Sequence, residues 1–168
     1  TLEVAAEFGA GLVCTHAGGL PPRTRPHRVS YDDVVADIIG RTTVLAEAAV
    51  EAGVDRERVM IDPGHDFGKN TRHSLEATRR LDELVGTGWP VLVSLSRKDF
   101  VGETLDLPPH ERLEGTLAAT AVSAWLGARG GPLPALSPEP RTRNTATMPT
   151  MTMTAIATFQ PNDPLRLR

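Results

Sequence analysis

Three short polar segments hold most of the residues in this sequence that could do chemistry. They span residues 15–19, 62–70 and 96–102, and each one follows an apolar stretch of the chain. Short apolar stretches of this kind are typical of buried β-strands. In parallel α/β folds, ligands bind beyond the carboxyl ends of the strands. We therefore expect the three segments to meet on one rim and to form a ligand site.

Asp62 is the first candidate residue. It closes the apolar stretch 59–61, where partial burial would require its carboxylate to find hydrogen-bond donors. The two oxygens could accept a matched pair of N–H groups, such as those of an amino-pyrimidinone edge. An Asp before Pro-Gly also commonly starts a turn. The spacing alone leaves both interpretations open.

Lys98 and Arg97 come directly after the apolar stretch 90–95. Lys98 could donate to a carbonyl or phosphate oxygen. It could also lie in solvent and pair with Asp99 or Glu103, and from residue type alone we favour this interpretation. Arg97 could hold an anion through two parallel hydrogen bonds or form an ordinary salt bridge at the strand end.

His16, His65 and Asp66 are residue types that bind metals, but no two of them have the spacing of a known metal-binding motif. Histidines that are hydrogen-bonded within the rim are the favoured interpretation. The glycines at 64 and 68 match neither the dinucleotide pattern nor the phosphate-binding loop that ends in Gly-Lys-Ser/Thr. We predict no metal ligands in this chain.

The elements that must position these residues alternate between strands and helices. The pattern predicts strands at 10–15, 59–61 and 90–95. It also predicts the end of a helix before Gly9, a helix that is opened by the capping-box spacing of Ser30 and Asp33 and ends at Gly53, a helix from Asn70 or Thr71 to Gly86, and an Ala-rich helix at 115–126. Such alternation indicates parallel strands with helical crossovers. A doubly wound sheet and part of a (β/α)₈ barrel both fit, since a full barrel needs ~250 residues.

Composition limits the function classes. The chain has 168 residues, of which 40% are hydrophobic and 23% charged, and a net charge of −3. These values predict a globular protein without the basic surplus of nucleic-acid binders. No apolar run approaches the ~20 residues of a membrane span. The single Cys14 excludes an intramolecular disulfide framework. We expect a cytoplasmic protein that binds neither nucleic acid nor membranes.

The composition changes after Gly130. Seven of the 14 prolines lie within residues 131–168, and the Thr- and Met-rich stretch 145–158 has neither a helical nor a strand period. Such a segment cannot bury enough apolar area to offset the entropy lost on ordering. We expect a folded domain at 1–130 and a disordered or aberrant tail at 131–168. The apolar face of the 115–126 helix, which includes Trp125, is expected in the core or at a subunit contact.

The polar segments together resemble the dihydropteroate synthase family. Residues 61–70, Ile-Asp-Pro-Gly-His-Asp-Phe-Gly-Lys-Asn, look like its Asp-Pro-Gly-x-x-Phe-Gly-Lys signature. Residues 96–102 are similar to its Ser-Arg-Lys-x-x-x-Gly segment. Residues 111–118, Glu-Arg-Leu-Glu-Gly-Thr-Leu-Ala, resemble the opening of its seventh helix, and 11–18 its fifth strand. The resemblance covers about residues 1–130, as a fragment of such a protein would.

The resemblance implies a TIM barrel, of which this chain would supply about strands five to seven with their helices. It also implies a transferase of folate biosynthesis that joins 6-hydroxymethyl-7,8-dihydropterin diphosphate to 4-aminobenzoate. The cofactor would be Mg²⁺, with its ligand outside this chain, and the full-length protein would be a homodimer. Asp62 would hold the amino and ring N–H edge of the pterin, and Lys98 would donate to its carbonyl side. Phe67 and Arg97 would shape the aminobenzoate side.

Two places depart from the family pattern. The common Gly-Phe-Gly-Phe becomes Gly64-His65-Asp66-Phe67, and a Ser common after Ser-Arg-Lys becomes Asp99. In the family that Ser meets the aminobenzoate carboxylate. Two like charges ~4 Å apart repel by about 4 kcal/mol at an effective dielectric near 20. An Asp99 side chain that points inward would therefore oppose aminobenzoate.

Both departures resemble the divergent second synthase paralogue of actinobacteria. An inactive or repurposed paralogue that retains a pterin-like pocket is therefore the alternative function. A pterin-dependent methyltransferase of the same barrel superfamily is a further alternative. The segments at 96–102 and 111–118 argue against the methyltransferase.

Overall fold

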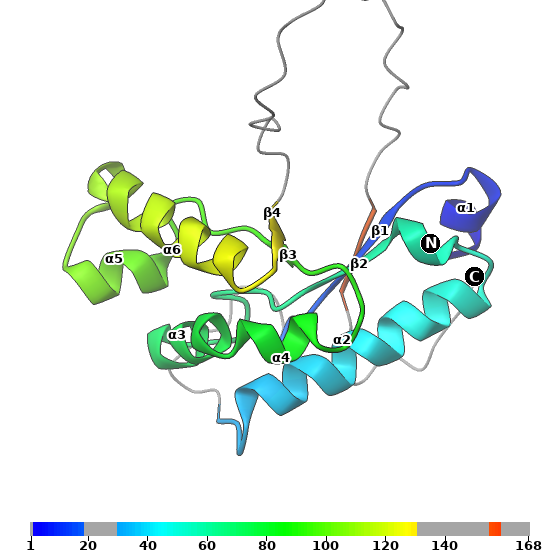
Figure 1. Ribbon diagram of the computed structural model, residues 1–168, viewed down its shortest axis with the longest axis horizontal. Coiled ribbons are helices and arrows are strands. Elements are labelled where there is room, and N and C mark those ends of the chain that lie inside the picture. The colour runs from blue at the N-terminus through cyan, green and yellow to red at the C-terminus, as the bar shows by residue number, and fades with distance from the viewer. Residues whose placement is uncertain (1, 19–29, 131–154, 159–168) are drawn as a thin grey trace, which may run out of the picture.

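The computed structural model describes residues 2–18, 30–130 and 155–158. Its helices are α1 (Leu2–Glu7), α2 (Val34–Glu51), α3 (Thr71–Arg79), α4 (Leu81–Val85), α5 (Asp99–Leu105) and α6 (Leu113–Trp125), with 3₁₀ turns η2 (Arg56–Arg58) and η3 (Pro109–Glu111). Its strands are β1 (Leu12–Thr15), β2 (Val59–Asp62), β3 (Leu92–Val93), β4 (Arg129–Gly130) and β5 (Ala155–Thr158). Figure 1 shows the strands through the middle of the molecule, with the longest helix, α2, running beside them.

The strands are parallel. One sheet has the order β2-β1-β5 and a second pairs β3 with β4. A parallel bridge between Ile61 and Val91 links the two sheets. The predicted parallel α/β arrangement is therefore confirmed. The β1–β2 register pairs Thr15 with Asp62, so the polar segments that follow these two strands leave the sheet at the same level.

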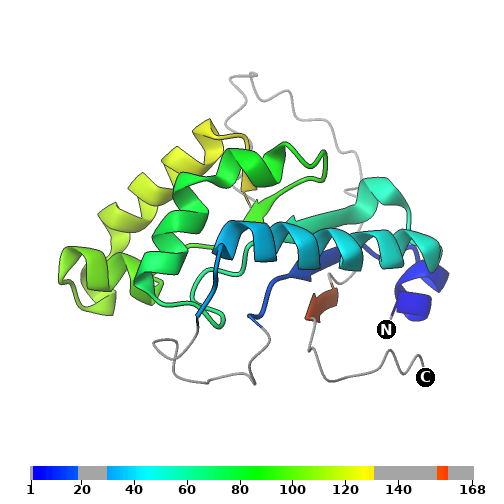
Figure 2. The same cartoon turned by 90° about the horizontal axis from the view of Figure 1, so that it is seen from below.

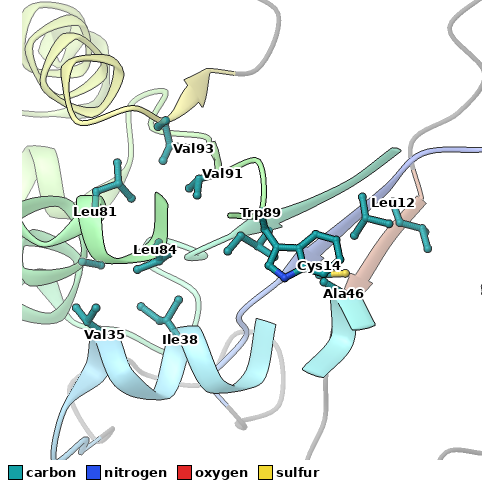
Figure 3. Close-up of a cluster of buried hydrophobic side chains, with 14 of the residues drawn as sticks. Leu12, Cys14, Val35, Ile38, Ala46, Leu81, Leu84, Trp89, Val91 and Val93 are labelled. Carbon is teal, nitrogen blue, oxygen red and sulfur yellow. The ribbon is translucent and has the colours of Figure 1, made fainter. Parts of the chain in front are cut away.

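The apolar faces of strands and helices meet in one core (Figure 3). Leu12 and Cys14 of β1 and Val35 and Ile38 of α2 are at most 1% exposed. Helix α2 lies against β1 and β2, and the view in Figure 2 shows it extending along them. Burying each large aliphatic side chain contributes about 1.5–3 kcal/mol. This packing sets the position of the strand ends and thus of the rim.

Helix α2 begins later than the spacing of Ser30 and Asp33 predicts. Asp33 itself is the N-cap, and its Oδ1 accepts hydrogen bonds from the backbone N–H of Val35 at 2.9 Å and of Ala36 at 3.1 Å. The capping-box prediction at Ser30 is wrong because an Asp already satisfies the first free N–H groups of the helix. The predicted end near Gly53, which has φ +97°, is confirmed.

The predicted helix from 70 to 86 is divided in two. Asn70 caps α3, and its side chain accepts from the backbone N–H of His73. The backbone at Arg80 leaves helical geometry before α4 starts. Leu75 is consequently 41% exposed, although its spacing predicted the same buried face as Leu81 and Leu84.

The region after β2 differs from the sequence prediction in two further elements. The strand predicted at 90–95 is reduced to the two residues of β3, next to the bridge at Val91. Helix α5 was not predicted, since its segment was interpreted only as a polar loop. Helix α6 agrees with the predicted Ala-rich helix and starts at Leu113. Trp125 is 91% exposed, so it does not belong to the core of this chain.

Four residues of the predicted irregular tail form a strand. Ala155–Thr158 pair in parallel with β1, with Leu12 opposite Ala155 and Thr15 opposite Thr158. The expectation of no strand in 145–158 is wrong for these four residues, because β1 offers an open edge with which they pair. The remainder of the tail, 131–154 and 159–168, lies outside the described residues. In the part of the chain that is described, no helix has both the length and the apolar character needed to cross a membrane.

Candidate functional site

The three polar segments come together at one rim. The backbone N–H of His16 donates to the carbonyl of Asp62 at 3.0 Å, which joins the segments after β1 and β2. The ammonium of Lys98 donates to the carbonyl of His65, which joins the segments after β2 and β3. The meeting of these segments follows from the parallel sheet, because all three strands end on the same side.

Asp62 lies at the end of β2 and is 8% exposed. Its Oδ1 accepts a hydrogen bond of 2.7 Å from the backbone N–H of Gly64, so the turn interpretation of this residue holds. Burial raises the pKa of the Asp62 carboxyl, while the Gly64 N–H and the charges of Lys98 and Lys69 lower it. The buried carboxylate thus closes a turn and faces two lysines.

Lys98 is partly buried just before α5, and the solvated interpretation favoured from its residue type is wrong. Its Nζ lies 4.6 Å from the centre of the Phe67 ring and donates a hydrogen bond to the carbonyl of His65. Burial lowers the pKa of Lys98, and the charges of Asp62 and Asp66 raise it. Because the strands are parallel, the ammonium of this lysine reaches the loop after β2 and does not pair with the carboxylate of Asp99.

Asp99 is held by Arg112 rather than by the lysine. Its Oδ1 accepts a hydrogen bond of 2.8 Å from Arg112, and its side chain is 78% exposed. Arg112 also donates to the carbonyls of Arg97 and Leu107, each at 3.0 Å. Asp99 therefore does not pair with Lys98, and its charge is partly neutralised by Arg112.

Phe67 and Arg97 are both exposed at the rim. The Phe67 side chain is 57% exposed, which gives the site an open aromatic surface. Arg97 has φ +51°, and its backbone N–H donates to the Thr116 hydroxyl at 3.1 Å. Left-handed backbone costs a residue other than Gly about 1 kcal/mol. The Arg97 conformation is thus held by the contacts from Thr116 and Arg112.

Sequence reasoning missed a buried group formed by Lys69, His16 and Asp37. Lys69 is 1% exposed, and its Nζ lies 2.7 Å from Nδ1 of His16. His16 Nε2 lies 2.7 Å from Oδ2 of Asp37 on α2. A signal was available: the sequence contains only two lysines, and both Lys69 and Lys98 fall in the rim segments.

The charge states within this group follow from burial. Burial, and then the charge of Lys69, lower the pKa of His16 to about 4, so its ring is neutral at pH 7. Burial lowers the pKa of Lys69 to about 7, against the effect of the Asp62 carboxylate. With His16 neutral, the bonding partners assign its proton to Nε2, which donates to Asp37, and leave Nδ1 to accept from Lys69.

His65 and Asp66 make internal contacts. His65 is fully buried, stacks on Phe100 at a centroid distance of 5.3 Å, and bonds the Thr78 hydroxyl through Nε2 at 2.9 Å. Burial, followed by the lysine charges, lowers the pKa of His65 to about 3. The Asp66 carboxylate accepts from the Ser74 hydroxyl at 3.2 Å. Within residues 2–18, 30–130 and 155–158, no three His, Cys, Asp or Glu side chains gather as a metal site.

Comparisons with known proteins agree with the resemblance carried by these motifs. The family model described as pterin binding enzyme matches residues 1–131. "Inactive dihydropteroate synthase 2" of Mycobacterium leprae (strain TN) is 64% identical over 131 residues, which cover 76% of this chain and 45% of that protein. "Dihydropteroate synthase" of Bacillus subtilis (strain 168) is 39% identical over 125 residues, with 74% and 41% coverage.

Among solved structures, dihydropteroate synthase from Thermus thermophilus has a TM-score of 0.72 and 38% identity, over 77% of this chain and 51% of that one. The same enzyme in complex with 4-aminobenzoate has a TM-score of 0.71 at 38% identity, over 77% and 50%. The chain therefore spans about half the length, or less, of the proteins it matches. Its α/β fold matches the corresponding part of the TIM-barrel synthases. By sequence and by fold, this chain belongs to the pterin-binding enzyme family, with dihydropteroate synthases and their inactive paralogues among its relatives.

Proposed function

We propose that this chain forms the pterin-contacting part of a dihydropteroate synthase-like protein. The observation that carries the proposal is that Asp62 and Lys98 meet at one turn: Asp62, which is 8% exposed, accepts from the backbone N–H of Gly64, and the partly buried ammonium of Lys98 donates to the carbonyl of His65. A pterin has N–H donors on one edge and acceptor atoms elsewhere on its ring. An acid and a base on neighbouring strand ends complement such a flat heterocycle.

Each residue of the pair has a definable role. Asp62 uses Oδ1 for the Gly64 turn, and its carboxylate accepts from the amino and ring N–H groups of the pterin. Lys98 donates to the carbonyl side and favours the electron-poor methylene from which diphosphate leaves. Phe67 offers its exposed ring next to Lys98. The rate would come from charge and position prepared before the reaction, without a covalent nucleophile.

The whole protein would join 6-hydroxymethyl-7,8-dihydropterin diphosphate to 4-aminobenzoate. In this assignment β1, β2 and β3 are strands five, six and seven of the barrel. Mg²⁺ is also proposed for the whole protein. Its ligand is proposed to lie outside this chain, since among the described residues no three His, Cys, Asp or Glu side chains gather as a metal site. A cytoplasmic location and a homodimer are proposed with the same activity.

A non-catalytic pterin-binding paralogue is the second candidate. Asp66 and Asp99 place two carboxylates at the start of α5, and Asp99 is held there by Arg112. Negative charge at this place opposes a carboxylate-bearing second substrate. The Mycobacterium leprae relative, which is 64% identical, carries the name "Inactive dihydropteroate synthase 2". These observations favour retained pterin binding with loss of aminobenzoate use.

Pterin binding by the 168-residue chain tests the proposal. In a fluorescence titration with 6-hydroxymethyl-7,8-dihydropterin diphosphate, we expect saturable binding, weakened about 10- to 100-fold by Asp62→Asn and by Lys98→Met. Losing a hydrogen bond to a charged group costs about 1.5–3 kcal/mol, which sets this range. Glu47→Gln, an exposed change on α2, is the matched control and leaves binding unchanged. Equal affinity in all four proteins contradicts the proposal.

Adding 4-aminobenzoate to the same samples separates the two candidates. Formation of 7,8-dihydropteroate, followed by chromatography, supports the synthase. Pterin binding without product, in the full-length parent protein as well as in this chain, supports the non-catalytic paralogue.

A further inference from the structure

The buried ammonium of Lys69 is surrounded by acceptors from two segments of the rim. Beyond Nδ1 of His16 at 2.7 Å, its Nζ donates to the carbonyls of Gly64 at 3.1 Å and Phe67 at 3.2 Å. The carbonyl of His16 is a fourth acceptor, at 3.4 Å. A buried ammonium is costly unless its three N–H donors are matched, and the acceptors around Lys69 are sufficient for all three. Lys69 therefore ties the backbone of its own loop to the end of β1.

Helix α2 determines how His16 presents its acceptor. The Nε2–H of His16 donates to Oδ2 of Asp37, and Nε of Arg41 donates to both oxygens of that carboxylate at 2.9 Å. With its proton fixed on Nε2, the ring directs a lone pair on Nδ1 toward Lys69. A chain of hydrogen bonds thus runs from α2 through His16 to the loop after β2.

The loop that Lys69 holds has little space to move. A Cβ atom at Gly64 would lie 2.1 Å from the carbonyl oxygen of His16, and one at Gly68 would lie 2.7 Å from that of Ala17. The Tyr31 hydroxyl donates to the carbonyl of Gly68 at 2.8 Å. The loop backbone is in direct contact with the end of β1, and the Lys69 bonds close this contact from inside.

We propose that Lys69 is a positioning residue whose ammonium, held by His16, which is in turn held by Asp37, fixes the turn from Gly64 to Phe67 and so orients Asp62 and Phe67 toward a pterin. The inference deepens the proposed function and rests on it. Lys69 acts through the loop and is assigned no contact with the ligand.

A dependence on pH follows from the position of this lysine among its charged neighbours. Burial, and to a lesser extent the charge of Lys98, lower the pKa of Lys69 to about 7. Asp62 on β2, Asp37 on α2 and Asp66 in the loop act in the opposite direction. Below that pH the ammonium has three N–H donors for its acceptors. Above it the neutral amine has two, so the turn loosens and pterin affinity falls.

The two-lysine composition makes the protonation of Lys69 directly measurable. Protein labelled with ¹³C at lysine Cε gives two side-chain NMR signals, and Lys69→Met identifies one by removing it. We expect the Lys69 signal to titrate with a midpoint near pH 7. Asp37→Asn removes a negative neighbour and should lower this midpoint, whereas Glu47→Gln on the same helix should not.

Binding is then measured on the same proteins with 6-hydroxymethyl-7,8-dihydropterin diphosphate between pH 6 and 9. At each pH the wild-type affinity is divided by that of Lys69→Met, because this ratio cancels the titration of the ligand itself. We expect the ratio to fall about tenfold from pH 6 to pH 9. In Asp37→Asn the fall should move to lower pH by the same interval as the NMR midpoint. A merely structural contact would not link these two midpoints.

Hydrogen exchange supplies a readout that needs no ligand. The Phe67 amide, which donates to the carbonyl of Gly64, should exchange faster in Lys69→Met and in wild type above pH 7, after correction for intrinsic rates.

Two results would overturn the inference. One is a Lys69 signal that shows no titration between pH 5 and 9.5, and the other is a Lys69→Met protein whose amide exchange and pterin binding equal those of the wild type. Absence of pterin binding in the wild type refutes the proposed function and with it the orienting role. The NMR and exchange arms still show whether Lys69 holds the loop.

Discussion

The carboxylate of Asp66 accepts a hydrogen bond of 2.7 Å from the backbone N–H of Asp99, at the first residue of α5. Asp66 has φ +66°, and its other carboxylate oxygen accepts a hydrogen bond from the Ser74 hydroxyl. The segments after β2 and β3 are therefore joined through a negatively charged group. A helix start that already binds one carboxylate is poorly suited to a second, because like charges repel.

This relationship predicts how aminobenzoate binding responds to substitution. Asp99→Ser alone should raise the affinity for 4-aminobenzoate only slightly, because Arg112 already neutralises part of that charge and Asp66 stays in place. Asp66→Gly combined with Asp99→Ser should raise it about tenfold or more. Calorimetry in the presence of a bound pterin measures both, with Asp82→Ser on α4 as the control. No gain in the double variant means that neither carboxylate faces this substrate.

The burial of His65 leads us to predict that the folded chain loses stability in acid. Its pKa is about 3 in the folded chain against 6.5 when exposed, so the unfolded state binds more protons between these values. Stability therefore falls with decreasing pH, by about 1.4 kcal/mol per unit from this residue. His65→Phe, which restores the residue common in the family pattern, should remove about 2 kcal/mol of the loss between pH 7.5 and 5.

Urea unfolding at the two pH values measures this difference. His110→Phe, at an exposed histidine of η3, is the control and should keep the wild-type dependence. A His65→Phe protein with the wild-type pH dependence would show that His65 is protonated without cost in the fold.

Alanine substitutions at Gly64 and at Gly40 together test the close contact between the loop after β2 and the end of β1, with Gly40 as the control. Gly64 has φ +62°, and a Cβ there would overlap the carbonyl oxygen of His16, so Gly64→Ala should cost about 3 kcal/mol or more. Gly40 lies inside α2 with no neighbour within 4 Å of such a Cβ. Gly40→Ala should stabilise by about 0.5–1 kcal/mol. Thermal unfolding of both variants checks the prediction, and similar changes in both would contradict the close approach of the loop.

The exposure of Trp125 leads us to predict that the protein self-associates. It is 91% exposed on α6, where Leu113, Leu117 and Val122 are also at least half exposed. If the surface of α6 around Trp125 forms the homodimer contact proposed above, Trp125→Glu should shift the protein toward monomer in sedimentation velocity at micromolar concentration. Val44→Glu, at a 60% exposed position of α2, is the control. Identical sedimentation of wild type and Trp125→Glu excludes this face as the contact.

Much of the fold could be predicted from local patterns. The apolar stretches before Asp62 and before Lys98 are strands because β-branched and aliphatic residues cluster there between turn residues. The start of α2 was misplaced because two residues of one segment could cap it, and local spacing does not choose between them. Helix α5 was missed because its segment was interpreted by its polar residues alone.

The sequence by itself determined that parallel strands would end in polar segments, and that Asp62 and Lys98 would stand on the same rim. Periodicity and chain order suffice for this, because parallel strands have only one shared carboxyl end. Only the tertiary structure decided the partners of each charged group: Lys69 against His16 and Asp37, and Asp99 against Arg112. Hydrogen bonds between residues 13 to 53 positions apart depend on how helices and loops pack, and no local pattern encodes that packing.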